Sequence, residues 1–282
     1  MNAIESFLNE KIVSSTSIGG GCIADGKKIT TESGKAYFLK TKSGFNRMFR
    51  CEANGLKELA KAQSVRIPQV IAVSDDSLLL EYIPQGIRSN RFFEQFGENF
   101  ARLHRFCSDK FGFYEDNYIG ATPQLNIPTG NESKNWTAFY FNKRLLYQYK
   151  LAESNGYATS RLKNSFSKLE SKIDSILKGS EEPPCLLHGD LWGGNYLCDE
   201  NGAPVLIDPA VYYGHREADL AMTKLFGGFT KEFYSSYNRE YPLPEGWEYR
   251  ENIYRLYHVL NHLNLFGRGY LSEADRILSD YV

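Results

Sequence analysis

The stretch His188-Gly-Asp-Leu-Trp-Gly-Gly-Asn195, followed by Leu206-Ile-Asp208, decides the fold class of this chain. In phosphoryl transfer from ATP by kinases, one Asp accepts the proton of the attacking hydroxyl. An Asn five positions later and a second Asp after the next strand hold magnesium. Asp190, Asn195 and Asp208 fit these three roles in the same order. This chemistry depends mainly on positioning and charge neutralisation, so it needs such groups on rigid neighbouring segments.

A hairpin brings these groups together in our interpretation, because NYLCD and PVLID read as strands joined by the turn DENGA. The alternative is that HGD and LID are ordinary turn carboxylates, which the full ordered set makes improbable. We expect His188 to be a structural histidine that holds the loop. Asp219 begins a predicted helix and either buttresses the loop or is a simple first-turn carboxylate.

The region before residue 84 reads as strands interrupted by one helix, predicted over residues 47–63. In AYFLK the period-2 rule puts Ala36, Phe38 and Lys40 on one face. Glu52 lies on the apolar stripe of the helix, where an unpaired carboxylate is costly. Lys40 is its natural partner, and such a pair directs an ammonium at ATP phosphates in kinases. An ordinary salt bridge is the alternative.

Two further segments are candidates for nucleotide binding. Gly19, Gly20 and Gly21 form a turn whose amides could approach phosphates, although three glycines also make a plain hairpin turn. Cys22 follows them, and we hypothesise that its oxidation inhibits the protein and that ATP protects it; the alternative is a buried small hydrophobic residue. Glu81, Tyr82 and Ile83 stand where a hinge would offer backbone groups to adenine, or they simply end a strand.

Pro84 and Gly86 mark the best linker, since strand patterning stops there and helical patterning begins. Helices are predicted from Ser89 as N-cap, over 136–152 and over 160–177. The expected fold is therefore α+β and bilobal like a protein kinase, with a small β-rich N-terminal ATP-binding lobe (1–83) and a larger, mainly helical C-terminal lobe (84–282) that carries the catalytic and substrate-binding residues.

Composition narrows the class of partner. The 282 residues carry 33 Lys plus Arg and 34 Asp plus Glu, a net charge of -1, which argues against nucleic acid as a partner. No long apolar run indicates a membrane segment, so we expect a cytoplasmic protein. The five scattered cysteines show no disulfide or zinc pattern. The sequence gives no indication of oligomeric state.

Several aromatic and histidine residues need an interpretation. Trp192 lies inside the catalytic stretch and is expected to face the substrate, with Tyr212 and Tyr213 as further aromatics beside the site. His258 and His262 are spaced i, i+4, but without a third ligand a core or surface pair is favoured over a metal site.

The chain resembles the fructosamine kinase, or ketosamine-3-kinase, family, which is related to the aminoglycoside and choline kinases. The resemblance rests on LLHGDLWGGN, LIDPAVYYGHREADLAM, GGGC, MFRCEANGL, LLLEYI, FGFYEDNYIGATPQLN and GRGY, so it spans nearly the whole chain. It implies ATP with a divalent cation such as Mg²⁺, and phosphorylation of the third-carbon hydroxyl of ketosamines, which are sugars attached to amines. The phosphorylated products release the amine, so the resemblance implies protein deglycation with a small or protein-borne ketosamine as substrate.

The resemblance also implies site residues. Asp190 would be the proton acceptor, Asn195 and Asp208 the metal ligands, Lys40 and Glu52 the phosphate-positioning pair, Glu81 to Ile83 the adenine hinge, and Gly19 to Gly21 the phosphate cover. Two other functions stay open: a kinase for another small hydroxyl compound, such as an aminoglycoside or choline-like amine, and a nucleotide-binding pseudokinase. A protein-serine kinase is disfavoured because H-R-D, D-F-G and A-P-E signatures are absent from the sequence.

Overall fold

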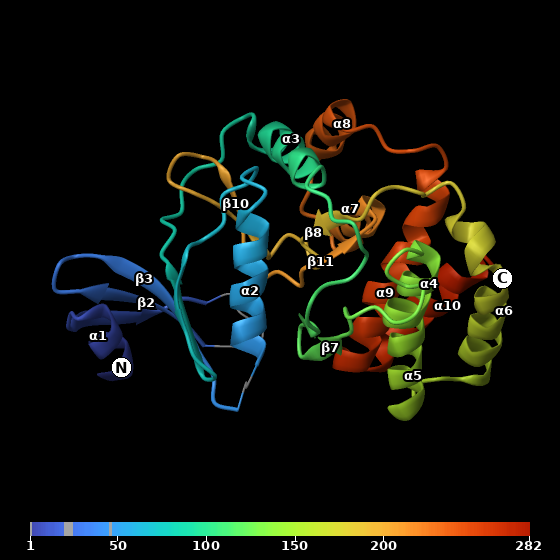
Figure 1. Ribbon diagram of the computed structural model, residues 1–282, viewed down its shortest axis with the longest axis horizontal. Helices are drawn as coiled ribbons and strands as arrows, with labels where there is room; N and C mark the ends of the chain where they lie inside the picture. The colour runs from blue at the N-terminus through green and yellow to red at the C-terminus, as the bar shows by residue number, and fades with distance from the viewer. Residues whose placement is uncertain (1, 20–24, 45–46) are drawn as a thin grey trace.

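The computed structural model describes residues 2–19, 25–44 and 47–282. Its first part is a five-stranded antiparallel sheet in the order β1-β2-β3-β5-β4. The strands are β1 (Ile12–Ser17), β2 (Asp25–Thr31), β3 (Ala36–Thr41), β4 (Val70–Val73) and β5 (Ser77–Glu81). Figure 1 shows this sheet at one end of the molecule, with α2 between it and the helical part.

Side-chain alternation along the strands explains why the sheet is covered on both faces. Leu39 and Leu79 belong to one apolar cluster, against which Leu8 of α1 (Asn2–Leu8) packs. Leu78 and Leu80 belong to another with residues of α2 (Met48–Ala60). Because neighbouring residues point to opposite faces, a run of consecutive leucines in β5 serves both helices.

The second part is mainly helical and carries three two-stranded hairpins or ladders. Its helices are α3 (Phe92–Leu103), α4 (Trp136–Tyr140), α5 (Tyr147–Ser154), α6 (Ser160–Leu177), α7 (Arg216–Leu225), α8 (Lys231–Glu240), α9 (Trp247–Phe266) and α10 (Leu271–Ser279), with a π-helix η1 (Phe141–Leu146) and a 3₁₀ turn η2 (Arg268–Tyr270). The paired strands are β6 (Asn117–Ile119) with β7 (Thr122–Gln124), β8 (Cys185–Leu187) with β11 (Tyr212–Gly214), and β9 (Tyr196–Cys198) with β10 (Pro204–Leu206).

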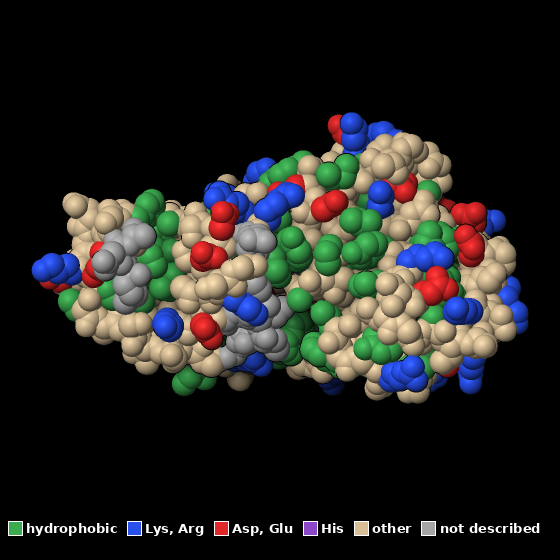
Figure 2. All heavy atoms as spheres, turned by 90° about the horizontal axis from the view of Figure 1, so that it is seen from below, with side chains coloured by type: hydrophobic (Ala, Val, Ile, Leu, Met, Phe, Trp, Pro, Cys, Tyr) green, Lys and Arg blue, Asp and Glu red, His purple; other side chains and the backbone are tan. Residues whose placement is uncertain are grey.

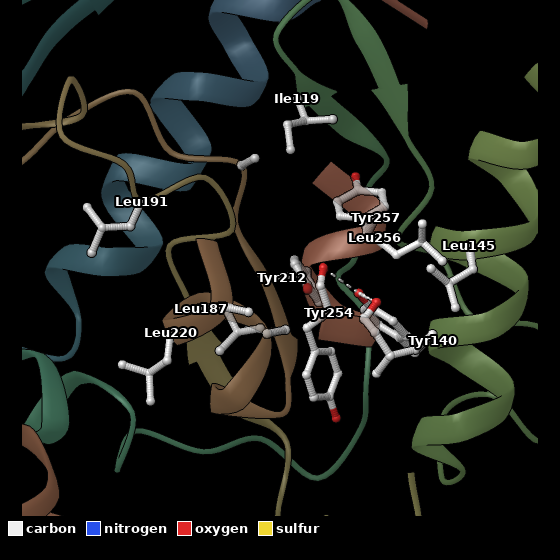
Figure 3. Close-up of a cluster of buried hydrophobic side chains, with 14 of the residues drawn as sticks. Ile119, Tyr140, Leu145, Leu187, Leu191, Tyr212, Leu220, Tyr254, Leu256 and Tyr257 are labelled. Carbon is white, nitrogen blue, oxygen red and sulfur yellow. Dashed lines mark hydrogen bonds between the residues drawn. The ribbon is translucent and has the colours of Figure 1, made fainter. Parts of the chain in front are cut away.

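The core of the helical part is rich in buried aromatic side chains. Tyr140 and Tyr254 approach each other in Figure 3, where the Tyr140 hydroxyl donates to the Tyr254 carbonyl oxygen at 3.1 Å. Trp136 Nε1 donates to the Tyr254 hydroxyl at 3.0 Å. These contacts satisfy the polar atoms that the aromatic residues carry into the core, and they join α4 to α9.

The predicted bilobal arrangement is confirmed, with a small sheet lobe and a larger helical lobe. The sheet ends at Glu81 and the next helix begins at Phe92; the division at residues 83 and 84 remains a prediction. Positive and negative side chains are interspersed on the face shown in Figure 2. Within the described residues, none of the helices is long and apolar enough to cross a membrane.

Two details of the helix predictions were wrong. Ser89 is not an N-cap: its carbonyl oxygen accepts from the Phe92 amide at 3.0 Å, which makes a turn before the helix, and the N-cap residue is Arg91. The predicted helix over 136–152 changes to π geometry over Phe141–Leu146 and ends at Ser154. A π segment inserts an extra residue per turn and cannot be read from apolar periodicity. The predicted helix over 160–177 was correct.

Candidate active site

The loop that follows β8 is held in place by the buried carboxylate of Asp219, on the first turn of α7. Asp219 accepts from the backbone amides of His188 and Gly189, both at 2.7 Å, and from His104 Nε2 at 3.2 Å. Burial alone would raise the pKa of Asp219, but these donors hold the pKa below its ordinary value. The open question of whether Asp219 buttresses the loop is thus answered.

His188 has the structural role expected of it. Its Nε2 donates to the Ile207 carbonyl oxygen at 2.9 Å, while its Nδ1 accepts from the Asp190 amide at 3.3 Å. Burial lowers the pKa of the imidazole, so the ring stays neutral with its proton on Nε2. Gly189 has φ +83°, and a side chain there would meet the Ala210 carbonyl oxygen at 2.0 Å. Only glycine fits that position.

Asn195 links Asp190 to Asp208. Its Nδ2 donates to the Asp190 backbone oxygen at 2.8 Å, to Asp190 Oδ2 at 3.3 Å and to the Asp208 backbone oxygen at 3.4 Å. Asp208 follows β10 and has φ +54°, a conformation that non-glycine residues rarely adopt and that clusters at functional sites.

Lys40 of β3 brings the two lobes together. Its Nζ donates to Glu52 Oε1 of α2 at 2.7 Å and also pairs with Asp208 Oδ1. Burial alone would lower the pKa of Lys40, but the two carboxylates outweigh it and raise the pKa above its ordinary value. Burial raises the pKa of Glu52 despite its cationic partner. The contact predicted between Lys40 and Glu52 is present, and the ammonium stays charged at neutral pH.

The electrostatics of Asp190 differ from those of an ordinary aspartate. Burial raises its pKa well above the ordinary value, and the neighbouring charge of Asp208 raises it further, while the hydrogen bond from Asn195 lowers it. A carboxylate with a raised pKa is a stronger base once ionised, as a proton acceptor requires.

One cavity of about 460 Å³ contains these groups together with an aromatic and apolar wall. Lys40, Glu52, Asp190, Asn195 and Asp208 all line it, and so does Trp192. The remaining wall comes from α2, the β6–β7 hairpin, α7, α9 and the residues just after β3 and after Asp208: Lys42, Met48, Phe49, Cys51, Asn117, Tyr118, Ile119, Gly120, Ala121, Pro209, Met222, Asn261, His262, Leu265 and Phe266.

The oxygen ligands present fit a magnesium ion. Mg²⁺ prefers carboxylate and carbonyl oxygens and keeps room for phosphate oxygens and water. Asp208 and Asn195, whose side chains carry a carboxylate and an amide oxygen, both line the cavity.

Other predicted residues lie elsewhere. Glu81, Tyr82 and Ile83 do not line this cavity. The Glu81 carboxylate accepts from Arg66 at 2.7 Å and from the Gln69 amide at 3.1 Å, so its side chain is already bound within the lobe. Gly19 is exposed, with open space beside its Cα. Gly20, Gly21 and Cys22 lie outside the described residues.

The prediction that two further aromatic residues lie beside the site with Trp192 was wrong. Tyr212 and Tyr213 are buried and do not line the cavity, because β11 pairs with β8 inside the core. Tyr212 lies under the Arg144 guanidinium at 4.0 Å, and the Tyr213 hydroxyl donates to Glu58 at 2.8 Å. Proximity in sequence to Asp208 was therefore a misleading signal.

His262 is a cavity residue that the sequence interpretation set aside. The His262 Nδ1 donates to the His258 carbonyl oxygen at 2.8 Å, while His258 itself is buried. Across the residues that the structure describes, no cluster of three or more His, Cys, Asp or Glu side chains is arranged to hold a metal. The sequence pattern of α9 could predict that His262 lies one helical turn after His258, but it could not predict that His262 lines this cavity.

Comparison with known proteins decides the family. The model of the fructosamine kinase family matches residues 2–282. A protein-ribulosamine 3-kinase of rice (Oryza sativa subsp. indica) is 40% identical over 280 residues, covering 96% of this chain and 80% of the relative. The mouse (Mus musculus) ketosamine-3-kinase is 33% identical over 291 residues, covering 92% of each chain. This chain belongs to the fructosamine kinase family.

A solved structure agrees with that membership. A protein of Thermobifida fusca assigned as a fructosamine-3-kinase superposes with a TM-score of 0.89 at 29% identity, covering 99% of this chain and 96% of the other. The predicted family and the protein-kinase-like fold are confirmed. As a fructosamine kinase family member, the chain is an ATP-dependent phosphotransferase.

Proposed function

We propose that this protein transfers the γ-phosphoryl group of ATP to the third-carbon hydroxyl of ketosamines, and that Asp190 is the base. The observation that carries the proposal is the meeting of Asp190, Asn195, Asp208 and Lys40 on the wall of one cavity that also has Trp192 on its wall. Family membership supports the ketosamine as acceptor. The phosphorylated product would release its amine, which would make the reaction one of protein deglycation.

Each charged residue has one task in this proposal. Asp190 accepts the proton of the sugar hydroxyl, for which its raised pKa suits it. Asp208 and Asn195 would hold Mg²⁺, which neutralises phosphate charge when bound. Lys40, oriented by Glu52, directs its ammonium at phosphate oxygens. The backbone of Glu81 to Ile83 and the glycines at 19–21 remain the proposed adenine and phosphate contacts.

Trp192 is the proposed contact for the sugar. It lies two residues after the base in the chain and lines the same cavity. An aromatic face gives a rigid apolar contact and leaves the hydroxyls of a sugar free to hydrogen-bond. The carboxylates on the described cavity wall are Glu52, Asp190 and Asp208, and each has a partner. A polycationic aminoglycoside would find two of these three negative charges already paired with Lys40.

We propose a cytoplasmic location on the evidence of the thiols. Cys51, Cys107, Cys185 and Cys198, which are the cysteines within the described residues, are all free. Free thiols are usual in reducing compartments.

The test is a screen of ATP consumption over amines carrying fructose, ribulose or erythrulose, with choline and kanamycin as competing acceptors. The proposal expects consumption with at least one ketosamine, strict dependence on Mg²⁺, and one added phosphate located on the third carbon by NMR. The product should lose phosphate and yield free amine on standing. Consumption with choline or kanamycin alone would overturn the ketosamine assignment, and the Asp190→Asn variant controls for contaminating kinases.

A further inference from the structure

Two exposed phenylalanines stand beside the cavity and have no part in the proposed transfer chemistry. Phe226 is 45% exposed and Phe266 is 64% exposed, and Phe266 lines the cavity. The Phe226 ring lies 6.3 Å from Trp192, edge to face, and 4.8 Å from His262. The Phe266 ring lies 5.4 Å from His262. Trp192, Phe226, His262 and Phe266 therefore form one aromatic rim.

The backbone fixes where both phenylalanines stand. Phe226 is the C-cap residue that follows α7, and the turn after it packs on the catalytic loop: a side chain at Gly228 would meet Gly193 Cα at 3.1 Å. The Tyr196 hydroxyl donates to the Gly228 carbonyl oxygen at 3.0 Å. Phe266 ends α9, where the Gly267 amide caps the helix by donating to Leu263.

We infer that Phe226 and Phe266 form a subsite for the amine substituent of the acceptor, where they contact the hydrocarbon stem that follows the ketosamine nitrogen. The inference rests on the proposed function. A sugar hydroxyl that reaches Asp190 brings the sugar against Trp192, and Phe226 and Phe266 continue that aromatic wall into solvent. Clusters of exposed apolar side chains in soluble proteins are typical of binding sites.

The chemistry of the rim suits a lysine-like stem. Methylene groups gain from contact with aromatic faces, and the same faces attract the positive charge of the ketosamine nitrogen. His262 does not oppose that charge. Its Nδ1 proton is given to a carbonyl oxygen, and burial lowers the pKa of the ring, which is therefore neutral at physiological pH. Because the rim is open to solvent, the rest of a carrier peptide can remain outside.

The experiment compares two acceptors that differ only in the stem, namely 1-amino-1-deoxyfructose and its N-butyl derivative. A half-buried four-carbon stem is worth roughly tenfold in affinity, so the parent enzyme should prefer the butyl derivative by about that factor in kcat/KM. Phe266→Ala and Phe226→Ala should each reduce this preference by at least about threefold. Phe7→Ala removes an equally exposed phenylalanine on α1 and should leave the preference unchanged.

The result separates the subsite from the proposed function. Turnover of both acceptors with the same preference in the parent, Phe226→Ala and Phe266→Ala would overturn the subsite and leave ketosamine phosphorylation standing. An equal loss of preference in Phe7→Ala would also overturn it. No turnover of either acceptor by the parent, with turnover of choline or kanamycin, would overturn the proposed function and the subsite together. Thermal unfolding of each variant checks that the fold is kept.

Discussion

Two carboxylates at the catalytic loop, Asp219 of α7 and Asp190 of the loop itself, have opposite electrostatics. Asp219 fixes the start of the catalytic loop and accepts hydrogen bonds from His104 and from two backbone amides. Asp190 lies one residue beyond those amides and receives a weaker contact, at 3.3 Å, from Asn195. The pKa of Asp219 is lowered and that of Asp190 is raised, although burial raises both. Donors and neighbouring charge decide the sign together: three donors hold the pKa of Asp219 down, whereas Asp190 has one weak donor and the negative charge of Asp208 beside it.

The largest effect is expected from neutralising Asp190. Asp190→Asn should lower kcat by about 10²-fold or more, since a general base contributes at least that factor, while ATP still binds. Because a raised pKa means that the ionised carboxylate destabilises the folded state, the variant should unfold at the same temperature as the parent or higher at pH 8.

Steady-state kinetics and thermal unfolding on the same preparation check this prediction. In the parent, kcat/KM should fall as the pH is lowered through the pKa of Asp190, above the ordinary aspartate value of 3.8. Asp75→Asn, on an exposed surface pair with Arg50, is the matched control. Near-normal turnover in Asp190→Asn would remove Asp190 from the role of base.

The second test removes the charge of Lys40, which pairs with Asp208 of the other lobe, and the charge of its neighbour Glu52. Lys40→Met should reduce kcat/KM by roughly 10²-fold, because an ammonium aimed at phosphate charge supplies a few kcal/mol of transition-state stabilisation. Glu52→Gln should cost somewhat less. If the two residues act as one unit, the double variant should be no worse than Lys40→Met alone. Effects that multiply across the double-mutant cycle would count against the unit.

The third test removes the carboxylate of Asp219, which accepts three hydrogen bonds. Asp219→Asn places an amide where two backbone N–H groups and His104 donate, so about 2–4 kcal/mol of stability should be lost at pH 7. A group with a lowered pKa stabilises the fold above its ordinary pKa and loses that effect as pH falls through its folded pKa. The stability gap between parent and variant should therefore be constant from pH 5 to 8 and narrow below about 3.8. Urea unfolding across this range measures it, and a pH-independent gap would contradict the explanation.

The sequence predicted the charged and amide residues of the cavity far better than the aromatic residues proposed to contact the acceptor. Asp190, Asn195 and Asp208 lie on one loop and one hairpin, so local spacing determines their approach. Lys40 and Glu52 lie on adjacent elements, and the cost of a lone buried carboxylate identified the pair. His262 and Phe266 reach the cavity only because α9 packs against α7, which no local pattern reveals. Tyr212 and Tyr213 were assigned wrongly for the same reason, since strand pairing in the core determines where their side chains point.

The smallest effect is expected at a buried amide, Gln124 of β7, which tests whether packing around the cavity affects acceptor binding. Its Nε2 donates to Asn117 Oδ1 and to the Ala210 carbonyl oxygen, both at 2.9 Å, and its Oε1 accepts from the Tyr257 hydroxyl at 2.8 Å. Gln124 thus ties the β6–β7 hairpin, which lines the cavity, to the segment after Asp208 and to α9.

Gln124→Glu keeps the acceptor for Tyr257 but replaces both donations by repulsion between oxygens, which should displace the β6–β7 hairpin that lines the cavity. We expect KM for the ketosamine to rise roughly fivefold, equivalent to about one lost hydrogen bond, while KM for ATP changes by less than about twofold. Tyr257→Phe removes one bond without repulsion and should have a smaller effect on the same constant. A purely structural loss would change both Michaelis constants or lower the unfolding temperature without separating them. Equal changes in the two constants would therefore show that Gln124 supports the whole fold and does not position the acceptor.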